Sequence, residues 1–222
     1  MLLTVAVVVA LVGPTPSARG DAAALTGSFT ALTYNVAGLP EALSGSEPTT
    51  NSALISPLLN AYDLVLLQED WAEVLLAARE AGLVGDDVPR TGYHDQVVAE
   101  ADHPYRSEPV PALWGPDLRR APSGPTLSPD GLNRLSRLAF GPVTRTMWEQ
   151  CHGDLSETVA EEVLAATGAD GVLDGAGLSD LNHEIDGGSA DCMAQKGFSL
   201  AQTDLASGVT VDVYNLHADA GA

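Results

Sequence analysis

The chain has 222 residues, 45% of them hydrophobic, which is enough to build one large core or two smaller ones. Its 30 acidic side chains outnumber 10 basic ones and give a formal net charge of -20 at pH 7. A bulk charge of this sign repels polyanions and disfavours nucleic-acid binding, although a bound divalent cation can reverse the sign locally.

The N-terminal segment has features of an export signal. Residues 2–13 are apolar and as long as a signal-peptide core, and small residues suited to cleavage follow them. The run is short for a bilayer span. No Lys or Arg precedes it, which departs from the usual signal and leaves a buried N-terminal strand as the alternative. We expect residues 1–24, approximately, to be the signal peptide of a secreted protein without a transmembrane anchor.

The segments that follow are expected to fold as a strand, a helix and a second strand. Residues 28–36 alternate in side-chain character, which is typical of a strand. Residues 49–62 place apolar side chains on one face of a helix. Residues 63–69 form a nearly continuous apolar run, as in a strand covered on both faces. The polar residues Asn35 and Glu69 therefore lie at the ends of two strands.

The middle of the chain mixes regular elements with long loops. Residues 72–82 predict a helix, and a Gly- and Asp-rich loop follows it. Residues 99–131 contain many prolines and few periodic apolar positions, so we expect a long surface loop there. Strands are expected to resume at residues 132–140 and 143–151, and an amphipathic helix at residues 155–168.

The last part of the chain combines a glycine-rich stretch with a hairpin. Residues 170–191 are rich in Gly and Asp and could attract calcium, but they lack the EF-hand spacing and its final glutamate. Residues 196–205 and 209–217 predict the two strands of a hairpin. His217 ends the second strand, and a polar residue at such a position is a candidate for chemistry.

The chain contains two cysteines, Cys151 and Cys192. An even count in an exported protein favours a disulfide between them. A metal site built from the two thiolates is less favoured, because neither cysteine has a partner at metal-binding spacing.

Three strand-end residues are candidates for a functional site, each with an ordinary alternative. Glu69 follows the most hydrophobic strand, where a rigidly held carboxylate suits Mg2+ or Mn2+, but it could equally be a solvated acid. Asn35 could orient a ligand or cap the following turn. A lone histidine such as His217 is more often structural than catalytic.

Taken together, six segments in this order closely resemble the endonuclease/exonuclease/phosphatase superfamily of metal-dependent phosphodiesterases, whose members include deoxyribonuclease-like and sphingomyelinase-like enzymes. The joint occurrence of the segments is more specific than any one of them, and the resemblance covers residues 28–222 with gaps. The matching segments are "LTYNVAGLP", "YDLVLLQED", "ADHPYRS", "DGLNRLSR", "ADCMAQKGFS" and "VYNLHADAG".

The resemblance implies an α/β (α+β) fold, a four-layer α/β/β/α sandwich with the active site where strand ends converge. After the strand that ends in His217, the superfamily has a "GDxN" strand and a terminal "SDH", and this sequence contains neither. We therefore expect residues 28–222 to be the N-terminal part of such a domain, with the C-terminal strands missing. We also expect the chain as given to be inactive.

The resemblance also implies roles for individual residues. Glu69 would bind the catalytic Mg2+ (or Mn2+), and Asn35 would help to position the metal or the phosphate. His217 would be one of two active-site histidines that assist proton transfer to the leaving oxygen. Lys196 matches a basic phosphate contact of the relatives, with a solvated hairpin residue as the alternative.

The expected function is that of a secreted, Mg2+-dependent phosphodiesterase, with a phospholipid headgroup preferred over nucleic acid as substrate. The charge of -20 argues against long nucleic acids. Cys151 and Cys192 fall where secreted sphingomyelinase-like members carry a similar pair. The alternatives are a deoxyribonuclease-like endonuclease of the same fold and a non-catalytic binding module. No stable protein partner is implied.

One segment departs from the superfamily pattern. About twenty residues, 72–92, separate the metal-binding glutamate from the next matching segment, where a more direct connection is expected. Because this insertion could displace the residues after it, Tyr93 and His94 are not counted among the site residues.

Overall fold

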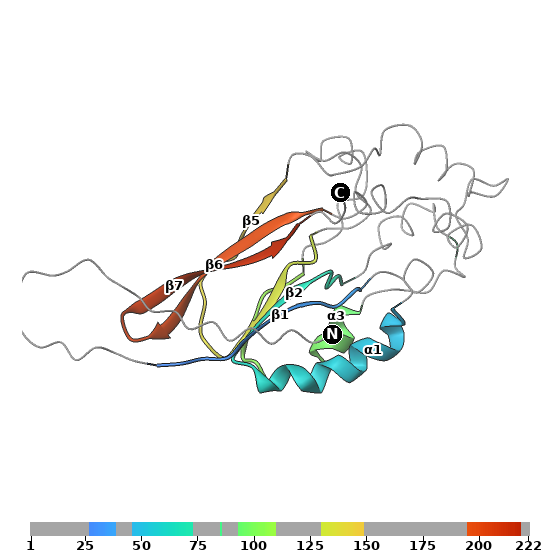
Figure 1. Cartoon of the computed structure of the whole chain (residues 1–222), viewed down its shortest axis with the longest axis horizontal. Coiled ribbons are helices and arrows are strands. Elements are labelled where there is room, and N and C mark those ends of the chain that lie inside the picture. Colours follow the sequence, from blue (N-terminus) through green and yellow to red (C-terminus); the bar gives the residue numbers. More distant parts are fainter. Residues whose placement is uncertain are drawn as a thin grey trace, which may run out of the picture.

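The computed structural model describes residues 27–38, 46–72, 85, 93–109, 130–148 and 195–218 (Figure 1). Several sequence predictions lie outside these residues and stay predictions. They are the signal peptide at 1–24, the helices at 72–82 and 155–168, the glycine-rich stretch at 170–191, and the disulfide between Cys151 and Cys192.

The first sheet has four strands in the order β1-β2-β4-β3. Strands β1 (Ala31–Asn35) and β2 (Leu64–Gln68) are parallel, and the helical segment between them provides the crossover that parallel strands require. Strand β4 (Asn133–Ser136) runs antiparallel to β2, and the short β3 (Tyr105–Arg106) lies beside β4. Strand β2 is central and largely buried, which explains its continuous apolar sequence.

The second sheet has three antiparallel strands in the order β5-β6-β7. Strand β5 (Thr144–Met147) pairs with β6 (Gly197–Ala206), which forms a hairpin with β7 (Val209–His217). The predicted hairpin is therefore confirmed. Its turn contains Gly208 with a φ of 76°, a left-handed conformation that glycine adopts without strain.

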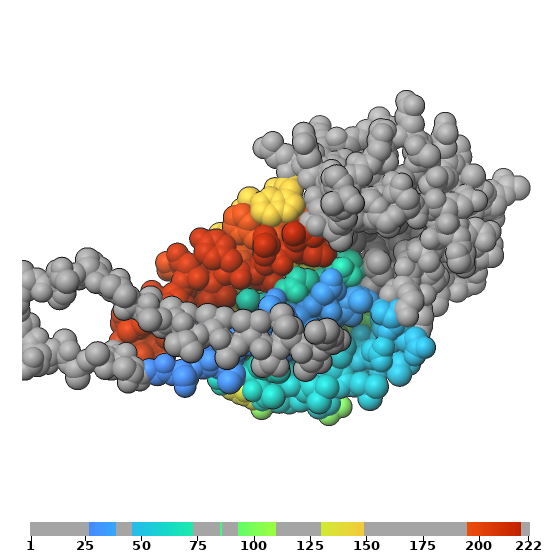
Figure 2. All heavy atoms as spheres, in the orientation of Figure 1, coloured from blue at the N-terminus to red at the C-terminus, as the bar shows by residue number. Residues whose placement is uncertain are grey.

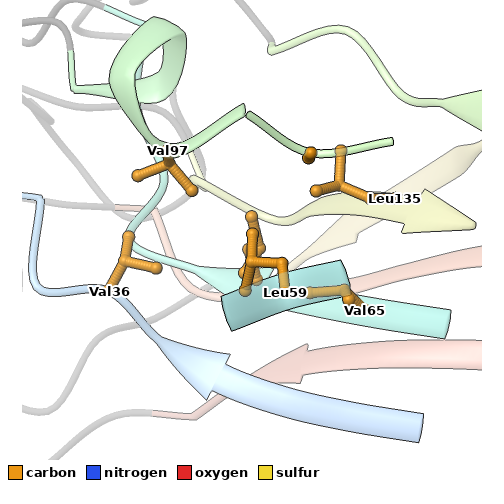
Figure 3. Packing of buried hydrophobic residues seen from close by; sticks show 7 residues of the cluster. Val36, Leu59, Val65, Val97 and Leu135 are labelled. Atoms are coloured by element: carbon orange, nitrogen blue, oxygen red, sulfur yellow. The ribbon is translucent and has the colours of Figure 1, made fainter. Parts of the chain in front are cut away.

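Helices cover the face of the first sheet that points away from the second. Helix α1 (Pro48–Ile55) passes into the 3-10 helix η1 (Ser56–Ala61), and α3 (His94–Val98) packs beside them. The change of helix type comes directly before Pro57, which lacks an N–H to continue the α-helical hydrogen bonds. The hydrophobic core between helices and sheet is formed by Val36, Leu59, Val65, Leu67, Val97, Ala101 and Leu135 (Figure 3).

The two sheets face each other. The atoms of β6 and β7, orange and red in Figure 2, lie against the blue and teal atoms of β1 and β2, and β7 contacts β2 directly. The described residues thus form a mixed α/β structure with helices on one sheet facing a second sheet, which confirms the predicted fold class. The helical layer expected on the second sheet is not among the described residues. Nor do these residues include a helix long and apolar enough to cross a membrane.

The described elements differ from the expected ones mainly in length. The loop expected at residues 99–131 contains β3, a two-residue strand too short to give an alternating pattern. The strand expected at 132–140 is regular only over β4, and Phe140 then forms an isolated bridge to Thr203 in the other sheet.

Candidate active site

The four residues that the sequence singled out lie at one edge of the paired sheets. Asn35 ends β1 and Glu69 directly follows β2, so the parallel direction of the two strands brings both residues to the same edge. His217 ends β7, and its register partner Gly197 directly follows Lys196. Residues from three separate parts of the chain therefore meet at this edge.

The side chains of these residues are in contact. Asn35 Nδ2 donates to Glu69 Oε1 at 2.8 Å, and His217 Nε2 lies 3.4 Å from the same oxygen. Lys196 Nζ is 3.3 Å from His217 Nε2. Asn35 Oδ1 also accepts from the backbone N–H of Ala37 at 2.8 Å, so this amide caps the turn and holds the carboxylate at once.

Burial decides between alternative interpretations of two residues. Lys196 is only 7% exposed, which rules out a solvated hairpin residue. The side chains of Glu69 and His217 are 19% and 9% exposed, so the carboxylate is not an ordinary surface acid. The Lys196 side chain lies beside the His217 imidazole, and its positive charge acts on the Glu69 carboxylate.

The pKa of Glu69 lies below its ordinary value. Burial alone would raise this pKa, but hydrogen bonds from His217 and Asn35 lower it, and so do the positive charges of His217 and Lys196. The carboxylate is therefore ionised at neutral pH. An ionised, partly buried carboxylate is suited to bind a hard divalent cation.

The backbone at Glu69 is left-handed, with a φ of 55°, a conformation that costs a non-glycine residue about 1–3 kcal/mol. Successive residues of a regular strand point to opposite faces. Here Gln68 and Glu69 both contact β7, Gln68 through Asn215 and Glu69 through His217. The left-handed residue thus turns the carboxylate toward the second sheet.

Neighbouring backbone groups hold this conformation. Gly38 N–H donates to the Glu69 carbonyl at 3.1 Å, and Asp70 N–H donates to the Gly131 carbonyl at 3.1 Å. Gly131 itself has a φ of 58°, and a Cβ there would come within 2.9 Å of the Glu69 Cα. Only glycine fits at this close approach without displacing the turn.

No protein-family model matches the chain. Sphingomyelinases of Mycobacterium bovis and of two Mycobacterium tuberculosis strains are 29% identical to it over 221 residues, which is 98% of this chain. By sequence, the chain is similar to these sphingomyelinases. This finding confirms the resemblance to the sphingomyelinase-like branch of the superfamily.

The chain spans 31% of the length of these sphingomyelinases. The crystal structure of SmcL aligns with 86% of this chain, and the alignment covers 48% of the SmcL chain. The TM-score is 0.46 and the sequence identity is 11%.

A second polar network begins at Asp70, directly after Glu69. The buried side chain of Asp70 lies 2.8 Å from His94 Nδ1, and Asn133 Nδ2 donates to the same carboxylate oxygen at 2.9 Å. Asn133 also donates to the Asp70 carbonyl at 2.5 Å. No sequence signal links Asp70 to His94. Residues 72–92, the segment that departs from the superfamily pattern, separate the two residues in the chain.

We expect the contribution of His94 to stability to depend on pH. Burial lowers its pKa, but the hydrogen bond and charge of Asp70, with the charges of Asp95 and Glu108, raise it above the ordinary value of 6.5 overall. Protonated His94 therefore stabilises the fold fully below pH 6.5, and this stabilisation is lost as pH rises through the folded-state pKa.

The variant His94→Gln is expected to lower the free energy of unfolding by about 1–3 kcal/mol in acid and by less in alkali. The measurement is urea unfolding of the complete gene product at about pH 5.5 and about pH 8.5. A difference from wild type that is the same at both pH values would contradict a charged Asp70–His94 pair.

Proposed function

We propose that the protein to which this chain belongs is a metal-dependent phosphodiesterase that cleaves the headgroup phosphodiester of sphingomyelin. One observation carries the proposal: an ionised Glu69 lies 3.4 Å from His217, which in turn lies beside the buried Lys196. The likeness to sphingomyelinases supports the substrate class.

Glu69 fits the role of a ligand for Mg2+ or Mn2+. Its pKa is low, and Asn35 and His217 both contact its Oε1. Within the described ranges no three His, Cys, Asp or Glu residues cluster as a metal site. Mg2+ is commonly held by one or two carboxylates together with substrate phosphate and water. A bound Mg2+ would neutralise phosphoryl charge and lower the pKa of water at the site.

The remaining residues would act on the phosphodiester directly. Lys196 would contact a phosphoryl oxygen with its buried ammonium, which offers a strong charge because little water screens it. His217 Nε2 would transfer a proton to the leaving oxygen. Asn35 would fix the orientation of the Glu69 carboxylate through its 2.8 Å hydrogen bond.

The substrate is tested by offering two phosphodiesters to the complete gene product. We expect release of phosphocholine from sphingomyelin vesicles and no nicking of plasmid DNA, since a net charge of -20 opposes approach of a polyanion. EDTA is expected to stop the release, and excess Mg2+ to restore it.

Two outcomes would overturn the proposal. Plasmid nicking without phosphocholine release would favour the deoxyribonuclease-like alternative. Vesicle binding without hydrolysis of either substrate, at saturating Mg2+ and Mn2+, would favour a non-catalytic binding module.

We also propose that the protein is exported. The apolar residues 2–13 and the two cysteines, Cys151 and Cys192, support this. Mass spectrometry of the culture supernatant, with and without a reducing agent, would detect both the cleaved N-terminus and the disulfide.

A further inference from the structure

A layer of buried hydrogen bonds connects the two sheets directly beneath the candidate site. At its centre is Asn215 on β7, which is 1% exposed. Its Nδ2 donates to the Leu67 carbonyl at 2.8 Å and to the Asn133 carbonyl at 3.1 Å. Leu67 and Asn133 are register partners in β2 and β4. A single amide therefore ties β7 to two adjacent strands of the first sheet.

Gln68 completes this connection from the other side. Its Nε2 donates to Asn215 Oδ1 at 2.5 Å and lies 3.1 Å from Thr33 Oγ1 on β1. Gln68 is buried as well. Hydrogen bonds thus run from β1 through Gln68 to β7, with both ends of the Asn215 amide satisfied.

These two residues stand next to the candidate catalytic pair. Gln68 directly precedes Glu69, and Asn215 lies two residues before His217 on the same face of β7. The contact between Gln68 and Asn215 therefore links the same two strands, β2 and β7, next to the contact between Glu69 and His217. A shift of β7 against β2 would break the first contact and change the second.

Apolar side chains could fill the space between the sheets, but they would fix the relative position of the strands less closely. Buried polar groups cost free energy unless they are hydrogen-bonded, and their bonds depend on distance and angle. We infer that Gln68 and Asn215 are positioning residues that set the distance between Glu69 and His217. The consequence for the rate of hydrolysis rests on the proposed function.

The variant Asn215→Leu tests the inference, because it keeps a similar volume and removes every hydrogen bond of the amide. We expect kcat for sphingomyelin to fall by at least about tenfold with KM changed by less than about threefold, since misplaced catalytic groups slow the chemical step. Gln68→Met, which removes one partner of Asn215 and leaves its two other bonds, is expected to show a smaller fall in kcat.

Ser199→Ala is the matched control. Ser199 is the register partner of Asn215 and is also fully buried, but its hydroxyl accepts from Arg134 Nη2 on β4 at 2.9 Å. We expect it to lower stability while changing kcat by less than about twofold. Equal falls in kcat for Ser199→Ala and Asn215→Leu would overturn the inference, as would an unchanged kcat in Asn215→Leu.

A measurement without substrate separates this inference from the proposed function. In histidine-labelled protein, the imidazole resonances of His217 are assigned by their loss in His217→Gln. We expect them to shift in Asn215→Leu or, where that variant does not fold, in Gln68→Met, and to stay in place in Ser199→Ala. If the wild type hydrolyses neither substrate, such a shift still supports the positioning role, and unchanged resonances in both test variants overturn it.

Discussion

Glu69→Gln is expected to lower kcat/KM for sphingomyelin by at least about 10³-fold, because a metal ligand contributes several kcal/mol and each 1.4 kcal/mol is about tenfold. Glutamine keeps the size of the side chain and can still accept from Asn35, so the left-handed turn should survive. It removes the negative charge that would bind the cation. Phosphocholine release at saturating Mg2+ measures the rate, and titration calorimetry measures the loss of Mg2+ affinity.

Glu100→Gln is the matched control for this substitution. Glu100 is exposed just after α3, and the change removes one negative charge from the same protein. We expect an activity within about twofold of wild type, as for surface substitutions elsewhere. If Glu69→Gln retained more than about a tenth of wild-type activity, a loss under 1.4 kcal/mol, the metal-ligand role would be excluded.

The strand-end position of three candidate residues could be predicted from the sequence. A continuous apolar run places the end of β2 next to Glu69, and alternating strands end at Asn35 and His217. That strand ends converge at the site came only from the resemblance, and the parallel pairing of β1 and β2 is what brings Asn35 and Glu69 together. The left-handed backbone of Glu69 was not predictable, since it depends on Gly131, far away in the sequence.

The surroundings of Lys196 depend on tertiary contacts that no local pattern contains. Its carbonyl accepts from the N–H of Trp148 at the end of β5, and its ammonium lies beside His217 from β7. A charged residue at the start of a hairpin strand is ordinarily exposed. The Lys196 side chain is buried because β5 and β7 lie on either side of β6.

The polar layer between the sheets does not follow from the alternation of apolar and polar residues along β6. In β6 the inward side carries Ser199 and Thr203, which are buried, while Phe198 and Leu200 on the outward side are half-buried. The alternation alone would place the apolar pair inward. Ser199 is accommodated on the inward side because its hydroxyl accepts from Arg134 Nη2 at 2.9 Å. The hydrogen bond between Arg134 and Ser199 joins residues that are 65 positions apart in the sequence. The one between Gln68 and Asn215 joins residues that are 147 positions apart.

His217→Gln is expected to lower kcat by about 10² to 10⁴-fold, the usual contribution of a general acid or base. The imidazole Nε2 lies between Glu69 Oε1 at 3.4 Å and Lys196 Nζ at 3.3 Å. Glutamine has similar length and can hydrogen-bond to both neighbours, but it does not titrate. The pH–rate profile of the residual activity should therefore lose one limb.

Tyr214→Phe provides the comparison on the same strand. Tyr214 lies on the opposite, exposed face of β7, so we expect kcat within about twofold of wild type and an unchanged pH–rate profile. A purely structural role of His217 makes a different prediction, in which kcat falls with stability and both limbs of the profile remain. Thermal unfolding of His217→Gln, measured with the pH–rate profile, decides between a proton-transferring histidine and one that only packs between Glu69 and Lys196.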